Sequence, residues 1–108
     1  MADKNELLIG RIVTEIDFVL DASRHMTESD FASDAYAQHA LTMAVLNIGE
    51  LTAHTSDDYR ASHAEIPWRQ MIGFRNAAAH SYDGLDMQIV WKTIREDLPE
   101  LKTLLLSL

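Results

Sequence analysis

Residues 87–108, with the sequence MQIVWKTIREDLPELKTLLLSL, carry the clearest structural pattern in the chain. Apolar residues recur there at spacings of 3, 1, 3, 4, 3, 4 and 3, at Met87, Val90, Trp91, Ile94, Leu98, Leu101, Leu105 and Leu108. This spacing places one apolar stripe along an α-helix. Pro99 lies inside the run. Because proline lacks an amide hydrogen and clashes with the preceding turn, it predicts a kink or two abutting helices.

Three stretches upstream of this segment also have helical periodicity. The first follows Asp3, a suitable N-cap residue, and the third begins near Ile66, with Pro67 in its first turn, and ends near Ser81. Residues 26–34 and 55–65 are polar and are predicted to be connections, each with at most a short helical turn. The apolar stripe of the first helix comprises Ile9, Ile12, Val13, Ile16, Val19 and Leu20, and that of the second comprises Ala37, Leu41, Ala44, Val45, Ile48, Leu51 and Thr52.

The composition fits a small helical domain. The chain has 108 residues, 47% of them hydrophobic, which is enough for one core and too little for two. It contains only 4 glycines and 2 prolines, and no stretch alternates apolar and polar residues long enough for a convincing strand. We therefore expect a single domain over residues 1–108 with an all-α fold, an antiparallel bundle of four to five helices.

Charge and cysteine content exclude several classes of function. The 9 basic and 17 acidic residues give a net charge of -8, so the chain is poorly suited to binding nucleic acid by overall charge. Any RNA contact must come from a local site or a partner. The absence of cysteine excludes disulfides and thiolate metal sites. The N-terminus is polar and acidic, unlike a signal peptide, and no apolar stretch reaches the roughly 20 residues of a membrane span, so a cytoplasmic protein is expected.

The third predicted helix holds the residues with chemical potential. At about 100° per residue, one stripe contains Trp68, Met71, Ile72, Arg75, Ala79 and Tyr82, and a second contains Arg69, Gly73, Asn76 and His80. The first stripe looks the more apolar and has Arg75 at its middle, while Gly73 on the second leaves room for another backbone. Arg75 and His80 lie about 140° apart on an unbroken helix. They share a face only if the helix ends or bends between them, or if a second copy of the chain supplies one of them.

Spacing alone leaves a structural interpretation open beside the catalytic one. An arginine in an apolar stripe often lays its stem over the core with its charged head in water, and a histidine near a helix C-terminus often complements the helix dipole. Asn76 then serves as a buried hydrogen-bonding residue and Tyr82 as an aromatic residue at the helix end.

The stretch Arg75-Asn76-Ala77-Ala78-Ala79-His80-Ser81-Tyr82 resembles the Arg-x4-His-x-Tyr motif of the HepT-like ribonuclease toxins, a branch of the HEPN superfamily. The similarity extends over roughly residues 6–105 and is weakest between residues 24 and 36. Its flanking segments are Ile48-Gly49-Glu50, Ile66-Pro67-Trp68, Ile89-Val90-Trp91 and Leu98-Pro99.

This resemblance implies a homodimeric HEPN-like bundle that cuts RNA without a metal and needs no cofactor. The family pairs with an MntA-type nucleotidyltransferase antitoxin, in a type II or type VII-like toxin–antitoxin system. That antitoxin silences the toxin by transferring AMP to the motif tyrosine, here Tyr82. The dimer and the antitoxin could also assemble into a higher hetero-oligomer. A non-catalytic helical module that binds a nucleotidyltransferase partner is the alternative.

The residue chemistry is compatible with metal-free cleavage, in which the neighbouring 2′-hydroxyl of the RNA is the nucleophile. His80 has an ordinary pKa of about 6.5 and suits an acid or base, while the planar fork of Arg75 suits a phosphate. Asn76, four residues before His80, can orient the imidazole or donate to phosphate. Tyr82, seven residues after Arg75, can reach the same phosphate, so an anionic adduct on it would block the site.

Several other residues complete the expectations. Glu50 lies on or beside the apolar stripe of the second helix and either pairs with Arg75 or Arg69, supports the site by a hydrogen bond, or is simply solvated. Asp57-Asp58 is expected to cap a helix, and the tryptophans to anchor the core or a dimer interface. The scattered histidines lack the spacing of a metal site, so none is expected.

Overall fold

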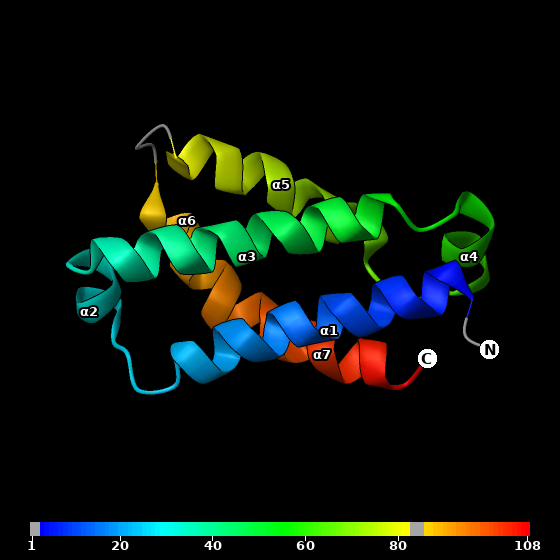
Figure 1. Cartoon of the computed structure of the whole chain (residues 1–108), viewed down its shortest axis with the longest axis horizontal. Coiled ribbons are helices and arrows are strands. Elements are labelled where there is room, and N and C mark those ends of the chain that lie inside the picture. Colours follow the sequence, from blue (N-terminus) through cyan, green and yellow to red (C-terminus); the bar gives the residue numbers. More distant parts are fainter. Residues whose placement is uncertain (1–2, 83–85) are drawn as a thin grey trace.

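Four long helical elements run antiparallel in the computed structural model, which describes residues 3–82 and 86–108 (Figure 1). The first three elements are α1 (Lys4–Ala22), α3 (Ala35–Ala53) and α5 (Trp68–Tyr82), and the fourth comprises α6 (Met87–Lys92), the π-helical turn η1 (Thr93–Asp97) and α7 (Leu98–Leu106) in succession. Two short helices, α2 (Glu28–Ala32) and α4 (Asp57–Ser62), fill the predicted connections. The described residues contain no strand. The all-α antiparallel bundle is confirmed.

Side-chain caps fix where these helices begin. Asp3 accepts a hydrogen bond from the Glu6 amide at the start of α1, as predicted. Thr27 and Asp30 form a reciprocal capping box at α2. At α4 the cap is Ser56, so the expectation for Asp57-Asp58 was wrong in detail. Those two carboxylates lie in the first turn of α4, where they complement the helix dipole.

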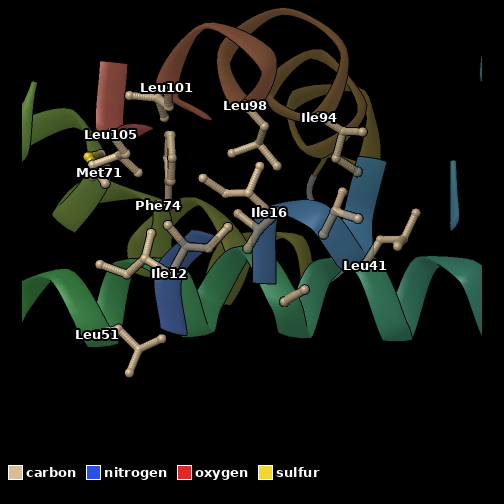
Figure 2. Close-up of a cluster of buried hydrophobic side chains, with 14 of the residues drawn as sticks. Ile12, Ile16, Leu41, Leu51, Met71, Phe74, Ile94, Leu98, Leu101 and Leu105 are labelled. Carbon is tan, nitrogen blue, oxygen red and sulfur yellow. The ribbon is translucent and has the colours of Figure 1, made fainter. Parts of the chain in front are cut away.

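The core lies between α1, α3, α5 and the C-terminal element (Figure 2). Side chains from all four meet there. The predicted stripes contribute Ile12, Ile16 and Val19 from α1 and Leu41, Ala44, Val45, Ile48 and Leu51 from α3. Truncating a fully buried member of this cluster to alanine costs about 2–5 kcal/mol. The fully buried aliphatic side chains include Ile12, Ile16, Leu41, Ile48, Met71, Ile94 and Leu98.

Pro99 divides the C-terminal segment, as the sequence predicts. It lies in the first turn of α7, where its missing amide hydrogen removes no helical hydrogen bond. The preceding turn is widened into η1, in which the Leu98 amide donates to the carbonyl of Thr93 instead of following the α-helical pattern. The apolar stripe continues across this turn, because Ile94, Leu98 and Leu101 are all buried.

Arg60 and Trp68 join α4 to the helices on either side of it. The Arg60 guanidinium donates to the carbonyls of Thr52 and Thr55 and to the Thr55 hydroxyl, and so caps the C-terminal end of α3. The indole N–H of Trp68 donates to the carbonyls of Arg60 and His63, at 3.1 and 2.9 Å. These contacts fix where α5 begins relative to α3.

None of the helices in the described part of the chain combines the length and apolar character that crossing a membrane requires.

Candidate functional site

The buried face of α5 differs from the one predicted. Trp68, Met71 and Phe74 enter the core, with 8%, 0% and 5% of their surface exposed. Ile72 is half-buried, and the side chain of Arg75 is 42% exposed. The prediction of an apolar stripe with Arg75 at its middle was therefore only partly right. It missed Phe74, and Arg75 lies at the margin of the core, where its guanidinium reaches solvent.

Close packing against α3 holds the backbone at Arg75. Gly49 lies opposite it, and a Cβ atom at Gly49 would stand 2.7 Å from the Arg75 amide nitrogen and 3.2 Å from the carbonyl oxygen of Ile72. Only a residue without a side chain permits this approach. The predicted role of Gly73 as a contact for another backbone is not seen within the chain, because a Cβ at Gly73 meets nothing within 4 Å.

Glu50 is the acidic partner of Arg75. Its Oε1 atom lies 3.6 Å from Arg75 Nη1, and the two side chains are 47% and 42% exposed. The distance exceeds that of a good hydrogen bond, so this is a loose ion pair, and such exposed pairs contribute about 0–1 kcal/mol. Of the alternatives that the sequence left open for Glu50, the structure shows pairing with Arg75. The guanidinium keeps donors available for a phosphate.

The rest of the motif occupies the second half of α5. Asn76 is exposed. His80 and Tyr82 belong to the same helix by their backbones, while their side chains lie outside the described part of the structure. Because α5 is continuous from Trp68 to Tyr82, it places Arg75 and His80 about 140° apart around its axis. Their convergence from one chain is therefore not provided by a bend in the helix.

The side of α5 near η1 carries a different set of polar groups. Asp97 accepts a hydrogen bond from the Gln70 side chain, which tends to lower its pKa. Burial and, secondarily, the neighbouring Glu96 outweigh this effect, so the pKa of Asp97 is raised above its ordinary value. With Glu65 and Glu100, Asp97 lines an acidic hollow of about 270 Å³. In the described ranges, no group of three or more histidines and carboxylates has a geometry that could hold a metal ion.

Comparison with known proteins identifies the family. The model of the family described as "Ribonuclease HepT-like" matches residues 12–108. The chain belongs to this family. A protein of Thermococcus cleftensis named "Probable ribonuclease HepT" is 36% identical over 91 residues, which cover 84% of this chain and 83% of the relative. The resemblance inferred from the motif and its flanks is confirmed.

Relatives of lower sequence identity carry similar names. Proteins of Methanocaldococcus jannaschii and Caldanaerobacter subterraneus, both named provisionally as RNases, are each 29% identical to this HepT-like chain. The aligned regions cover 84% and 87% of the chain and 84% of each relative. No solved structure matched in the corresponding comparison.

The contribution of α3 to this site could be predicted only in part. Glu50 was selected because it lies next to an apolar stripe, and the structure places it against Arg75. Gly49 was noted only as part of the family resemblance. Its signal in the sequence is a glycine inside an otherwise strongly helical segment, where it costs about 1 kcal/mol relative to alanine unless packing requires it.

Proposed function

We propose that this HepT-like chain is a metal-independent endoribonuclease. The observation that carries the proposal is the placement of Arg75, a half-exposed guanidinium held by close helix packing within an intact Arg-x4-His-x-Tyr motif. The helix that bears it, α5, contains two arginines and one histidine and no carboxylate, in a chain with a net charge of -8. This gives an acidic protein a local surface that an RNA phosphate can approach.

The proposed reaction uses the RNA's own 2′-hydroxyl. His80 removes or donates the proton, and Arg75 stabilises the negative charge that develops on the phosphate oxygens as the 2′-oxygen attacks phosphorus. The P–O5′ bond breaks, leaving a 2′,3′-cyclic phosphate and a 5′-hydroxyl. Asn76 orients His80 or donates to phosphate, and Glu50 positions Arg75.

A homodimer supplies the geometry that one helix lacks. Because α5 is one unbroken helix through the motif, the positions of Arg75 and His80 in one copy lie about 140° apart around its axis. A twofold axis beside α5 would bring two motifs into a single cleft, so that the arginine of one copy and the histidine of the other face the same phosphodiester. The exposure of Asn76 supports this arrangement, since it leaves the motif accessible to a ligand in such a cleft.

Tyr82, the last residue of the same motif, is the proposed site of regulation. We propose that an MntA-type nucleotidyltransferase antitoxin transfers AMP from ATP to the Tyr82 oxygen, with release of pyrophosphate. The adduct brings a phosphate charge and a nucleoside into the groove that Arg75 serves, and so excludes RNA. The chain would then be the toxin of a cytoplasmic toxin–antitoxin pair, with further assembly into a hetero-oligomer. A gain of one adenylyl mass on co-expression, absent in Tyr82→Phe, tests this step.

Net charge favours a second candidate, a non-catalytic module that binds the nucleotidyltransferase through the motif face. An overall charge of -8 opposes RNA binding, and Glu50 already partners Arg75. This candidate predicts a stable complex with the partner and intact RNA after incubation with the unmodified chain.

The test of ribonuclease activity is incubation of the purified, unmodified chain with RNA in excess chelator. We expect cleavage products that end in a 2′,3′-cyclic phosphate and a 5′-hydroxyl. Intact RNA, or cleavage that the chelator abolishes, would contradict the proposal.

A further inference from the structure

A hollow of about 570 Å³ lies beside the N-terminal half of α5. Pro67 and Ile72 form part of its apolar wall, and its charged lining residues are Arg60 and Arg69. Carboxylates line other hollows of the described structure, including one bordered by Glu65, Asp97 and Glu100. In a chain with a net charge of -8, a hollow whose charged groups are both cations is a specific feature, and it favours an anionic ligand.

The two arginines of this hollow have different roles. The Arg60 guanidinium is engaged by Thr52, Thr55 and Asp57 and is mostly shielded from solvent. Arg69 is exposed and takes part in no ion pair within residues 3–76 and 86–108. Arg69 is therefore the group that can bind an anion without losing a structural contact.

Arg69 shares one line of α5 with two motif residues. Taking Arg69 as the origin, Gly73 lies about 40° around the helix, Asn76 about -20° and His80 about 20°. Gly73 and Asn76 are accessible on this line, and a Cβ at Gly73 would meet nothing within 4 Å. The surface between the hollow and the motif is thus an open strip in which a ligand can approach the helix backbone.

The length of this strip suits a polynucleotide. Arg69 and Asn76 are separated by about 10 Å along the helix axis. A strand whose scissile phosphate lies at the motif would therefore have its neighbouring nucleotides over Gly73 and Arg69. Cationic side chains that follow the backbone are a usual element of a single-strand binding groove.

We propose that the strip Arg69–Gly73–Asn76 and the adjoining hollow form a subsite for single-stranded RNA next to the scissile phosphodiester, with Arg69 binding a backbone phosphate. This inference rests on the proposed ribonuclease function and adds that binding depends on the length of the RNA. RNA that spans the subsite binds better than RNA that fills the motif alone, and the gain depends on Arg69.

The test compares two substrates, a dinucleotide and a single-stranded RNA of about ten nucleotides. Arg69→Ala is expected to raise KM for the longer RNA about tenfold, with kcat within twofold, and to leave dinucleotide cleavage unchanged. Arg69→Lys, which keeps the charge, should recover most of the loss. Arg24→Ala is the matched control, because it removes an exposed arginine at the end of α1 and should change neither substrate.

Gly73→Leu tests the strip independently of charge. Since the glycine faces open space, the variant should fold normally and still raise KM for the longer RNA. If Gly73→Leu instead changes the oligomeric state, as measured by light scattering, and leaves KM unaltered, the strip is a protein contact and the proposal is wrong. Equal KM values for wild type and Arg69→Ala on the longer RNA would also overturn it.

A binding measurement tests this subsite independently of the proposed reaction. A 2′-O-methylated copy of the longer RNA cannot be cleaved, and its affinity is measured by fluorescence anisotropy over a range of salt concentrations. Loss of one phosphate contact in Arg69→Ala should reduce the salt slope by about 0.7. If the wild type cuts no RNA and this Arg69-dependent slope is present, the catalytic proposal fails and the subsite stands. If the wild type cleaves RNA and Arg69→Ala has the same salt slope as the wild type, the subsite proposal is wrong and the ribonuclease proposal stands.

Discussion

Gly49 on α3 lies directly against the backbone of Arg75 on α5, so close that a Cβ atom would stand 2.7 Å from the Arg75 amide nitrogen and 3.1 Å from Arg75 Cβ. The two helices are therefore tightly packed where the motif begins. The same contact brings Glu50, the residue after Gly49, to within 3.6 Å of the guanidinium. One small residue on α3 therefore sets both the position of the motif arginine and the identity of its acidic neighbour.

Gly49→Ala is expected to destabilise the fold. The added methyl group meets backbone atoms that cannot rotate away, and overpacking of this kind costs about 1–3 kcal/mol, against which alanine's helix propensity returns about 0.5–1 kcal/mol. The net loss should be about 1–2 kcal/mol in the free energy of unfolding, measured by denaturant titration. Gly10→Ala and Gly73→Ala are matched controls. Neither Cβ meets anything within 4 Å, so both should stabilise by about 0.5–1 kcal/mol.

Glu50→Gln should separate positioning from stability. Because the ion pair with Arg75 is half-exposed, the free energy of unfolding should change by less than about 1 kcal/mol. Loss of the carboxylate frees the guanidinium to bind phosphate in several orientations, so we predict that kcat for RNA cleavage falls about tenfold while KM does not rise. If KM rises instead and kcat is unchanged, Glu50 affects RNA binding alone and the prediction is wrong.

Arg60→Ala should loosen the C-terminal end of α3. The variant removes hydrogen bonds to the carbonyls of Thr52 and Thr55, and hydrogen bonds from charged groups contribute about 1.5–3 kcal/mol each when shielded from water. Partial solvation of Arg60 reduces this contribution. We therefore expect the free energy of unfolding, measured by thermal or denaturant unfolding, to fall by about 1–3 kcal/mol. Arg24→Ala, which breaks an exposed pair with Asp21, should change stability by less than about 1 kcal/mol. Equal losses in the two variants would contradict the capping role.

Asp97 gives the fold a defined pH dependence. Burial, together with Glu96, raises its pKa in the folded state, so the folded protein holds this proton more tightly than the unfolded chain does. Its contribution to stability is therefore fully present below the ordinary aspartate pKa of about 3.9 and is lost as the pH rises through the folded-state pKa. Asp97→Asn should be more stable than wild type at pH 7, and the difference should shrink on acidification. A difference independent of pH would show that the ionisation of Asp97 is not responsible.

The helices and their order could be predicted because their signals are local. Asp3 caps α1 as expected, and Pro99 divides the C-terminal segment. The widened turn before Pro99 was not predicted, because an α-helix with a kink and a π-helical turn share the same apolar spacing. Sequence patterns indicate the residues that point inward, while the hydrogen-bond pattern of a widened turn depends on packing.

The orientation of α5 was the main error, and its cause is physical. The stripe that looks the more apolar in the sequence omits Phe74, so periodicity alone did not show that Phe74 enters the core while Arg75 stays at its margin. The close contact between Gly49 and the backbone of Arg75 joins residues far apart in the sequence, so a local pattern does not reveal it. The functional roles of His80 and Tyr82 stay predictions, since their side chains lie outside the described structure.

The central claim is that Arg75 and His80 together cleave RNA without a metal, and its most direct test is the single-turnover rate of RNA cleavage in chelator by His80→Ala and Arg75→Ala. Both variants should keep the wild-type unfolding transition and oligomeric state. For Arg75 the reason is that it lies at the margin of the core and that its ion pair with Glu50 is loose. We predict that each lowers the rate at least a hundredfold. Wild-type rates in either folded variant would contradict the account.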